Sequence, residues 1–343
     1  MTAPEVGADG AAGARPRAAA PAVVVRGIVK QFGSHRAVED VSFTVPRGCV
    51  YGILGPNGAG KSTTLRMIND IIAPDAGSIE LLGGLRPGPE AASQIGYLPE
   101  ERGLYPRMRV IEMIELMGEL RGLSRPEARR RAGAWLDRLG LAQWAKNRVQ
   151  ELSKGMQQKV QFATALIHEP ALVILDEPWS GLDPINAEVL REVVDEIRAS
   201  GRTVLFSTHL MEQAEKVCDA VCIIARGRKV LDGRLRDLKR SWAADGRISL
   251  GFADDAARAK ADAVLGDAAL VADRLPPRAG DVADCEVKLA PGATPPRLLA
   301  ALVGAEVALR RFEVVVPTLH QIFVERVGDA AAVAERSAPH GAS

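Results

Sequence analysis

The chain has 343 residues, with 44 Lys and Arg against 43 Asp and Glu, so its formal net charge is only +1. This balance does not indicate a polyanionic partner, and we expect no binding to nucleic acid. The length predicts about two domains, each able to bury its own core. No apolar run approaches the roughly 18–20 residues that a membrane helix needs, so we expect a chain that is soluble by itself.

Residues 1–21 are dominated by Ala, Gly and Pro. They contain basic residues but no apolar core of the kind that a secretory signal requires. We therefore expect a disordered tail here, with the folded part of the chain beginning at about residue 22.

A glycine-rich loop follows the first apolar run. The run from Cys49 to Leu54 predicts a buried strand, and Ser62 to Asn69 predicts a helix. The residues that match the phosphate-binding pattern G-x-x-x-x-G-K-[ST] are Gly55, Pro56, Asn57, Gly58, Ala59, Gly60, Lys61, Ser62 and Thr63. In this pattern the backbone amides and the helix start cradle phosphate oxygens, Lys61 reaches the β- and γ-phosphates, and Ser62 holds Mg²⁺. The alternative is a chance glycine-rich turn.

A second helix start lies further along the chain, at Ser153. The following residues predict a helix to about His168, and a serine at this position is explained by helix capping alone. A helix N-terminus with a serine hydroxyl and the nearby amide of Gly155 is also an anion site. The residues by themselves leave both interpretations open.

Two acidic residues end the next apolar run. Leu172 to Leu175 predict a buried parallel strand, at whose carboxyl end Asp176 and Glu177 lie. Asp176 is then placed to reach Mg²⁺ through its water shell, and Glu177 to accept a proton from a water that attacks a γ-phosphate. The alternative for Glu177 is a simple charge at a strand end.

The order of the motifs resembles the ATP-binding subunits of ATP-binding cassette (ABC) transporters. The matching segments are Gly55 to Thr63, the signature at Leu152 to Gln157, the magnesium strand at Leu172 to Glu177, the D-loop at Ser180 to Asp183, and the switch at Ser207 to His209. The resemblance covers roughly Val23 to Lys239. It implies an α/β fold, with a P-loop ATPase core and a helical subdomain, and it implies ATP and Mg²⁺ as cofactors.

The resemblance also implies roles for residues outside the phosphate loop. Two such subunits close head to tail, so Ser153 and Gly155 of one would contact the γ-phosphate held by the other, beside the D-loop residue Asp183. His209 would contact the phosphate in its own subunit and orient the water. Phe32 matches the aromatic residue that stacks on adenine, although an isolated aromatic residue is also explained as part of a core.

Two positions depart from the common family pattern. Lys154 and Met156 replace a glycine and a glutamine of the signature, while Ser153 and Gly155 remain. Glu100 occupies the position where the family has a glutamine that approaches Mg²⁺ and the attacking water. A glutamate still offers oxygen to a metal but donates no amide hydrogen bond. We expect a metal site formed by Ser62, Glu100 and Asp176.

The expected domains are an ATP-binding domain at 22–240, with its helical subdomain at about 100–154, and a C-terminal α+β appendix at 241–327, followed by a flexible tail at 328–343. The elements expected in the appendix are strand 247–252, helix 256–264, strand 269–272, strand 285–289, helix 296–302 and strand 311–316. This βαββαβ order is that of a ferredoxin-like unit.

The segment from Phe312 to Phe323 resembles the end of the appendix of sodium-exporter-type and drug-exporter-type ABC ATPases. The resemblance implies an ATP-hydrolysing dimer that drives a separate membrane permease, most simply for export of an ion, drug or other small molecule. It would lie on the cytoplasmic side of the cell membrane as a peripheral subunit. The alternative is a soluble ABC ATPase that acts on another partner, such as the ribosome.

Overall fold

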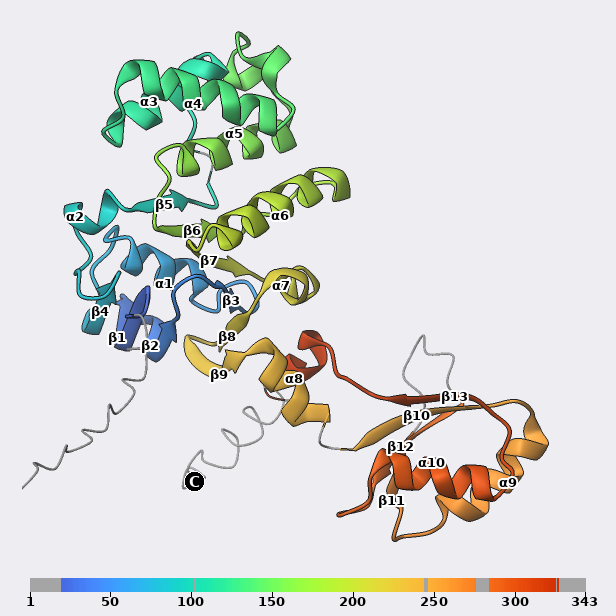
Figure 1. Cartoon of the computed structure of the whole chain (residues 1–343). Coiled ribbons are helices and arrows are strands. Elements are labelled where there is room, and N and C mark those ends of the chain that lie inside the picture. Colours follow the sequence, from blue (N-terminus) through green and yellow to red (C-terminus); the bar gives the residue numbers. More distant parts are fainter. Residues whose placement is uncertain (1–19, 102, 244–245, 276–283, 325, 327–343) are drawn as a thin grey trace, which may run out of the picture.

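The structure is a computed structural model that describes residues 20–101, 103–243, 246–275, 284–324 and 326 (Figure 1). The tail expected at 1–21 lies outside the described residues except for its last two, and the tail expected at 328–343 lies wholly outside them. Among the described residues no helix is long and apolar enough to cross a membrane.

A six-stranded sheet forms the centre of the domain expected to bind ATP, residues 22–240, which is called the ATPase domain from here on. In spatial order its strands are β5 (Ile95–Leu98), β6 (Leu172–Asp176), β7 (Thr203–Thr208), β3 (Val50–Leu54), β8 (Ala220–Ala225) and β9 (Arg228–Arg234). The first five are parallel, and β9 is antiparallel to β8. Every residue of β3, β6 and β7 is buried, as expected for parallel strands that are covered on both faces. The strands predicted before the phosphate loop and before Asp176 are thus present.

An antiparallel sheet of β2 (His35–Val45), β1 (Val23–Phe32) and β4 (Ala76–Leu81) packs beside it. Its buried valines and isoleucines share a core with one face of the six-stranded sheet and with helix α1 (Lys61–Ile68). This arrangement brings Phe32, the last residue of β1, to the side of the phosphate loop.

Helices surround the sheet and form a separate layer beyond it (Figure 1). They are α2 (Pro89–Ala92), α3 (Val110–Leu120), α4 (Arg125–Arg138), α5 (Lys154–Leu166), α6 (Pro184–Ala199), α7 (Met211–Val217) and α8 (Leu235–Ala243), with 3₁₀ turns at Ala142–Trp144 and Val149–Glu151. Helices α3 and α4 lie in the expected helical subdomain and pack on α5. Helix α5 begins directly after Ser153, as predicted, and ends at Leu166, two residues before the expected end.

The appendix is a four-stranded unit with two helices on one side of its sheet (Figure 1). Its elements are β10 (Arg247–Phe252), α9 (Asp255–Leu265), β11 (Val271–Leu275), β12 (Cys285–Leu289), α10 (Pro295–Gly304) and β13 (Leu309–Val314). The spatial order β11-β12-β10-β13, antiparallel throughout, is that of a ferredoxin-like unit. The predicted βαββαβ order is therefore present. Strand β11 begins two residues later than expected, because Leu270 and Val271 both donate backbone hydrogen bonds to Asp267 in a turn.

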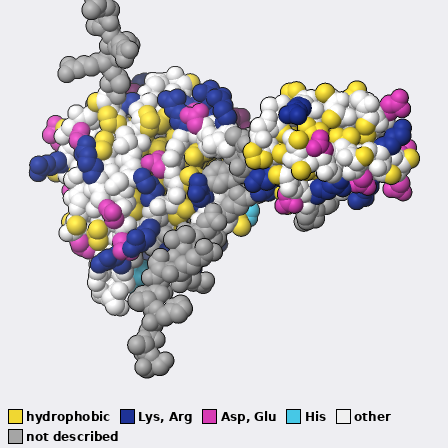
Figure 2. All heavy atoms as spheres, turned by 90° about the horizontal axis from the view of Figure 1, so that it is seen from below, with side chains coloured by type: hydrophobic (Ala, Val, Ile, Leu, Met, Phe, Trp, Pro, Cys, Tyr) yellow, Lys and Arg dark blue, Asp and Glu magenta, His cyan; other side chains and the backbone are white. Residues whose placement is uncertain are grey.

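Two connections join this unit to the ATPase domain. Helix α8 crosses the boundary expected between residues 240 and 241, and the unit projects from the side of the ATPase domain (Figure 2). After β13, residues 319–324 are helical, and Leu319 is buried in the core of the ATPase domain rather than in that of the four-stranded unit. The exact domain bounds stay a prediction.

Candidate ATP-binding site

The phosphate loop lies between β3 and α1 and requires its glycines. Gly55 has φ 154° and Gly60 has φ 100°, a region that favours glycine. A Cβ atom on Gly55 would lie 2.0 Å from the Ile224 carbonyl oxygen, and one on Gly60 would lie 2.4 Å from the Ala37 carbonyl oxygen. The backbone of the loop is therefore held tightly against neighbouring segments.

Lys61 is buried directly beneath this loop. Its Nζ atom donates hydrogen bonds to the carbonyl oxygens of Gly55 at 2.9 Å and Pro56 at 3.2 Å, and lies 3.3 Å from Glu177 Oε1. The side chains of Lys61 and Glu177 are only 5% and 6% exposed. A buried cation of this kind is costly unless it is paired, and here the loop carbonyls and Glu177 supply the partners.

Asp176 ends β6 in the interior of the site. Ser62 Oγ donates to Asp176 Oδ1 at 3.0 Å, and Ser207 Oγ donates to the same oxygen. Burial raises the pKa of Asp176, and the two hydroxyl donors oppose that shift. The second oxygen, Oδ2, is buried and has no hydrogen-bond partner among the described residues. A buried carboxylate oxygen beside a serine hydroxyl is the hard oxygen donor set that Mg²⁺ prefers, so these residues fit that ion.

Glu177 follows in the left-handed backbone region, with φ 48°. Thr208 Oγ1 donates to Glu177 Oε2 at 3.0 Å, and His209 Nδ1 lies 3.0 Å from Oε1. The Glu177 backbone N–H donates to the Ser207 carbonyl oxygen at 3.1 Å. A non-glycine residue in this region costs of order 1–3 kcal/mol, and such strain persists where surrounding contacts hold the residue. The carboxylate is thus fixed by groups from the end of β7.

Two of these partners, Ser207 and Thr208, had no role in the sequence prediction beyond their place in the switch motif. The parallel register of β6 and β7 pairs Asp176 with Ser207. Polar residues at the carboxyl ends of adjacent parallel strands meet at one edge of the sheet, and that rule could have identified both hydroxyls.

A cavity of about 340 Å³ opens over the loop. Its lining residues are Phe32, His35, Ala37, Glu100, Glu177 and residues 57–63. Phe32 is 49% exposed, so its alternative as a core residue is wrong. The Lys30 Nζ atom lies 5.7 Å from the centre of the Phe32 ring. The structure therefore brings an exposed aromatic ring, the phosphate loop and the carboxylates of Glu100 and Glu177 around one space.

Ser153, Gly155 and Asp183 are not among the residues that line this cavity. Ser153 Oγ accepts the Met156 N–H at 3.3 Å and caps α5. Asp183 Oδ1 accepts the Asn186 N–H at 2.9 Å and caps α6, and that backbone hydrogen bond lowers the pKa of Asp183. Within one chain, all three predicted residues lie apart from the phosphate loop.

Comparison with known proteins places these features in a family. Residues 38–180 match the family described as ABC transporter, and residues 233–327 match the C-terminal domain described as that of DrrA1-3-like ATP-binding proteins. The chain is 38% identical over 302 residues to the uncharacterized ABC transporter ATP-binding protein YhaQ of Bacillus subtilis, covering 88% of this chain and 97% of the relative.

Other relatives have more specific names. The linearmycin resistance ATP-binding protein LnrL of Bacillus subtilis is 33% identical, covering 88% of this chain and 96% of the relative. The Nod factor export ATP-binding protein I of Ralstonia nicotianae is 39% identical, covering 64% of this chain and 68% of the relative. A solved structure of an ATP-binding subunit of an ABC transporter superposes with a TM-score of 0.60 at 36% identity, covering 64% of this chain and 92% of that one.

Proposed function

Because the chain belongs to the ATP-binding proteins of ABC transporters and is an ATPase, we propose that it pairs with a second ATP-binding subunit around two ATP molecules and drives a separate membrane permease. The observation that carries this proposal is that Lys61, Ser62 and Glu177 line one cavity, with Lys61 paired to Glu177 and Asp176 accepting a hydrogen bond from Ser62 behind it. The second subunit is another copy of this chain or a related one.

The phosphate chain of ATP would lie over the loop, with its β- and γ-phosphates near Lys61. Mg²⁺, held by Ser62 and Asp176 and approached by Glu100, would neutralise charge on the phosphate oxygens. The ring of Phe32 would stack on adenine at the other end of the cavity, a contact typically worth about 1–3 kcal/mol per base.

Glu177 is the proposed general base. Its carboxylate would accept the proton of the water that attacks the γ-phosphate. Thr208 and His209 each contact one of its two oxygens and so fix its orientation. His209 would also contact the γ-phosphate from the same subunit. A carboxylate fixed by two hydrogen-bond partners stays in the orientation that proton transfer needs.

The position of Ser153 and Gly155, which do not line the ATP-binding cavity of their own chain, supports a second subunit. We propose that they contact the γ-phosphate held by the partner, with Asp183 at the same interface. The test is the molar mass of Glu177→Gln with ATP, measured by light scattering, since slow hydrolysis should trap the dimer. Adding Ser153→Glu should leave a monomer. Ser124→Glu is the matched control, because Ser124 is the exposed N-cap of α4, and it should still dimerise. A dimer that survives Ser153→Glu contradicts this part of the proposal.

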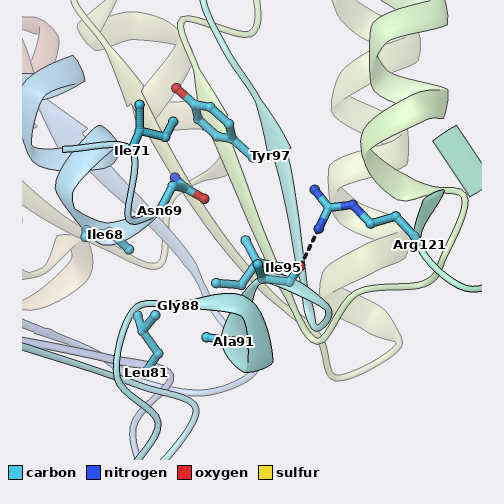
Figure 3. A pocket seen from close by; sticks show the side chains of 10 residues that line it. Ile68, Asn69, Ile71, Leu81, Gly88, Ala91, Ile95, Tyr97 and Arg121 are labelled. Atoms are coloured by element: carbon cyan, nitrogen blue, oxygen red, sulfur yellow. Dashed lines mark hydrogen bonds between the residues drawn. The ribbon is translucent and has the colours of Figure 1, made fainter.

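A second cavity, of about 180 Å³, is a candidate contact for the permease (Figure 3). It lies between the end of α1, helix α2, strand β5 and Arg121 at the end of α3, and Ile95 and Tyr97 form part of its wall. Ile71 at its edge is 54% exposed and the nearby helix residue Leu120 is 69% exposed. Apolar residues exposed around a hollow are typical of protein contact sites.

This cavity is connected to the ATP site through residues 99–101. Strand β5 ends at Leu98, and Glu100 follows at the edge of the ATP cavity. Gln161 of α5 donates to the carbonyl oxygens of Pro99 at 3.0 Å and Glu101 at 3.3 Å, on either side of Glu100. We infer that movement of a permease segment in this cavity would be coupled to Glu100 and to α5, the helix that begins in the signature motif.

Purification from native membranes tests the partner. We expect a multi-helix membrane protein to co-purify with the wild-type chain, and its loss with Ile71→Glu while ATPase activity stays normal. Co-sedimentation with ribosomes, without such a membrane protein, would favour the alternative partner. Association with a permease would place the chain at the cytoplasmic face of the membrane.

Export is the proposed direction, because relatives at 33% and 39% identity are named for linearmycin resistance and Nod factor export. A reconstituted pair should move a small molecule outward in an ATP-dependent manner. Uptake by the same pair would contradict this direction without affecting the ATPase assignment.

A further inference from the structure

The segment that follows the four-stranded unit, residues 318–324, begins with a helix N-cap. Thr318 and Gln321 make a reciprocal capping box: the Thr318 N–H donates to Gln321 Oε1 at 2.9 Å, and the Gln321 N–H donates to Thr318 Oγ1 at 3.3 Å. Residues 319–324 are helical. The sequence thus specifies a defined structure directly after β13 and the extended residues that follow it.

The apolar side chains of this segment pack against the ATPase domain. Leu319 and Ile322 are fully buried, and Leu319 belongs to the same core cluster as Met211, Ala214 and Val217 of α7. Phe323 packs on that cluster as well. Figure 1 shows the segment returning to the base of the ATPase domain beside α8. The four-stranded unit is therefore attached at both of its ends.

Glu215 of α7 receives both attachments. One carboxylate oxygen, Oε1, forms a close ion pair with Lys239 of α8, where the chain leaves the ATPase domain. The other, Oε2, accepts the Leu319 N–H at 3.1 Å, where the chain returns. Leu319 lies 104 positions after Glu215 in the sequence, and Lys239 lies 24 positions after it, so one side chain joins two distant segments to α7.

Helix α7 also leads directly to the ATP site. It begins at Met211, two residues after His209, and its apolar residues pack in the core of the domain. The Leu210 N–H donates to Thr208 Oγ1 at 3.1 Å, and Thr208 in turn donates to Glu177 Oε2 at 3.0 Å. His209 contacts the other oxygen of the same carboxylate. A shift of this short helix would therefore change how Glu177 is held.

We propose that Glu215 is a positioning residue for ATP hydrolysis: by fastening α8 and residues 318–324 to α7, it holds the Thr208–His209 corner against Glu177. The inference rests on the proposed roles of Glu177 and His209. Among the described residues, the hydrogen bonds and the ion pair of Glu215 involve Lys239 and Leu319 and not the phosphate loop or Phe32, so ATP affinity is expected to stay unchanged. The four-stranded unit then influences the rate of hydrolysis through its attachments.

The test compares full-length variants in steady-state ATPase assays. Glu215→Met keeps the size of the side chain and removes both acceptors, and kcat should fall at least about fivefold with KM for ATP unchanged, since small displacements of catalytic groups are costly. Glu215→Gln keeps an acceptor for the Leu319 N–H and should retain most of the activity. Glu212→Gln, an exposed acid on the same helix, is the control and should match wild type. A wild-type kcat for Glu215→Met overturns the proposal.

A double-mutant comparison separates positioning from general destabilisation. If Glu215 acts through His209, Glu215→Met should change kcat by less than about twofold in a His209→Ala background, because the two effects are then not additive. An equal loss in both backgrounds overturns the proposal. Leu319→Ala loosens the same attachment from the other side and should show the same loss of kcat at constant KM, which keeps the test decisive if Glu215→Met folds poorly.

The same series includes Glu177→Gln, so that two failures can be told apart. If Glu177→Gln hydrolyses ATP at the wild-type rate, the proposed function fails at its general base. If Glu177→Gln is slow while Glu215→Met and Leu319→Ala are normal, only the role of Glu215 fails.

Discussion

Three charged side chains of the ATP-binding site lie in the interior, whereas charged side chains in the four-stranded unit lie mostly at the surface. Lys61, Asp176 and Glu177 are buried and contact one another or a small set of hydroxyls. In the four-stranded unit, the ion pair between Lys260 and Glu306 spans 3.7 Å with side chains 55% and 87% exposed. Its buried acid, Glu286, faces Ser249 across the sheet instead of ending a parallel strand.

The buried charged residues at the ATP-binding site and the exposed charged residues of the four-stranded unit should therefore differ in how strongly their substitution affects the protein. Burying charge is costly unless the partners are arranged in advance, whereas exposed pairs contribute about 0–1 kcal/mol. We therefore expect substitutions at the ATP cavity to change binding and rate strongly, and matched substitutions on the four-stranded unit to change little.

Lys61→Met should have the largest effect on ATP binding. It removes the cation that we propose faces the β- and γ-phosphates, and we expect ATP affinity to fall by more than about 10²-fold, as for loss of a buried charge-assisted contact of about 3 kcal/mol. It also leaves Glu177 with one partner fewer, so the melting temperature should fall. Binding of a fluorescent ATP analogue and a thermal melt measure the two effects. Near-normal affinity of Lys61→Met for ATP would show that Lys61 does not contact the phosphates.

Phe32→Ala should have the next largest effect. Loss of the proposed stacking on adenine should weaken ATP binding by about 5- to 150-fold, corresponding to about 1–3 kcal/mol. The rate at saturating ATP should stay close to wild type, because in the proposed arrangement the ring would contact the base and not the phosphates. A dissociation constant within about twofold of wild type would show that the exposed ring is not the adenine platform.

Glu100→Gln tests the departure from the family pattern. Both side chains offer an oxygen to a metal, and Glu100 is exposed at the cavity edge, so most of the ATPase activity should remain. The assay is the initial rate at several Mg²⁺ concentrations. Complete loss of activity would mean that the carboxylate has a role that the amide cannot take.

Lys260→Met on the four-stranded unit should have the smallest effect. Its partner lies 3.7 Å away at the surface, so the free energy of unfolding should change by less than about 1 kcal/mol and the ATPase rate should stay normal. Chemical denaturation with a parallel ATPase assay measures both. A loss comparable to that of Lys61→Met would end the distinction between the two regions.

The sequence allowed the parts of the ATP site that have a local signal to be predicted. The phosphate loop, Asp176 and Glu177 follow apolar runs that form buried strands, and strands β10 and β12 have the predicted bounds because turn residues flank them. The contact between Ser207 and Asp176 depends on the register between β6 and β7, which the sequence of one strand alone does not specify.

The return of Leu319 to the ATPase core could not be predicted from periodicity. Its apolar neighbours in α7 lie more than a hundred positions away, and nothing in a short apolar segment specifies which of two cores it joins. The start of β11 was misplaced for a different reason: Asp267 forms a turn, in which its side-chain Oδ1 accepts the Ala269 N–H at 2.9 Å and its carbonyl oxygen accepts the N–H groups of Leu270 and Val271, and this local turn signal was not used.

The most direct test of the ATP site is the comparison of ATP binding and ATP turnover in Glu177→Gln. The side chain keeps its size and loses the ability to accept a proton, so ATP should still bind while turnover slows by about 10²–10⁴-fold, the usual contribution of a general base. Glu212→Gln serves as the control for removal of one acidic charge. Tight ATP binding with slow turnover is the predicted result, and wild-type turnover in Glu177→Gln would contradict the assignment of this carboxylate as the base.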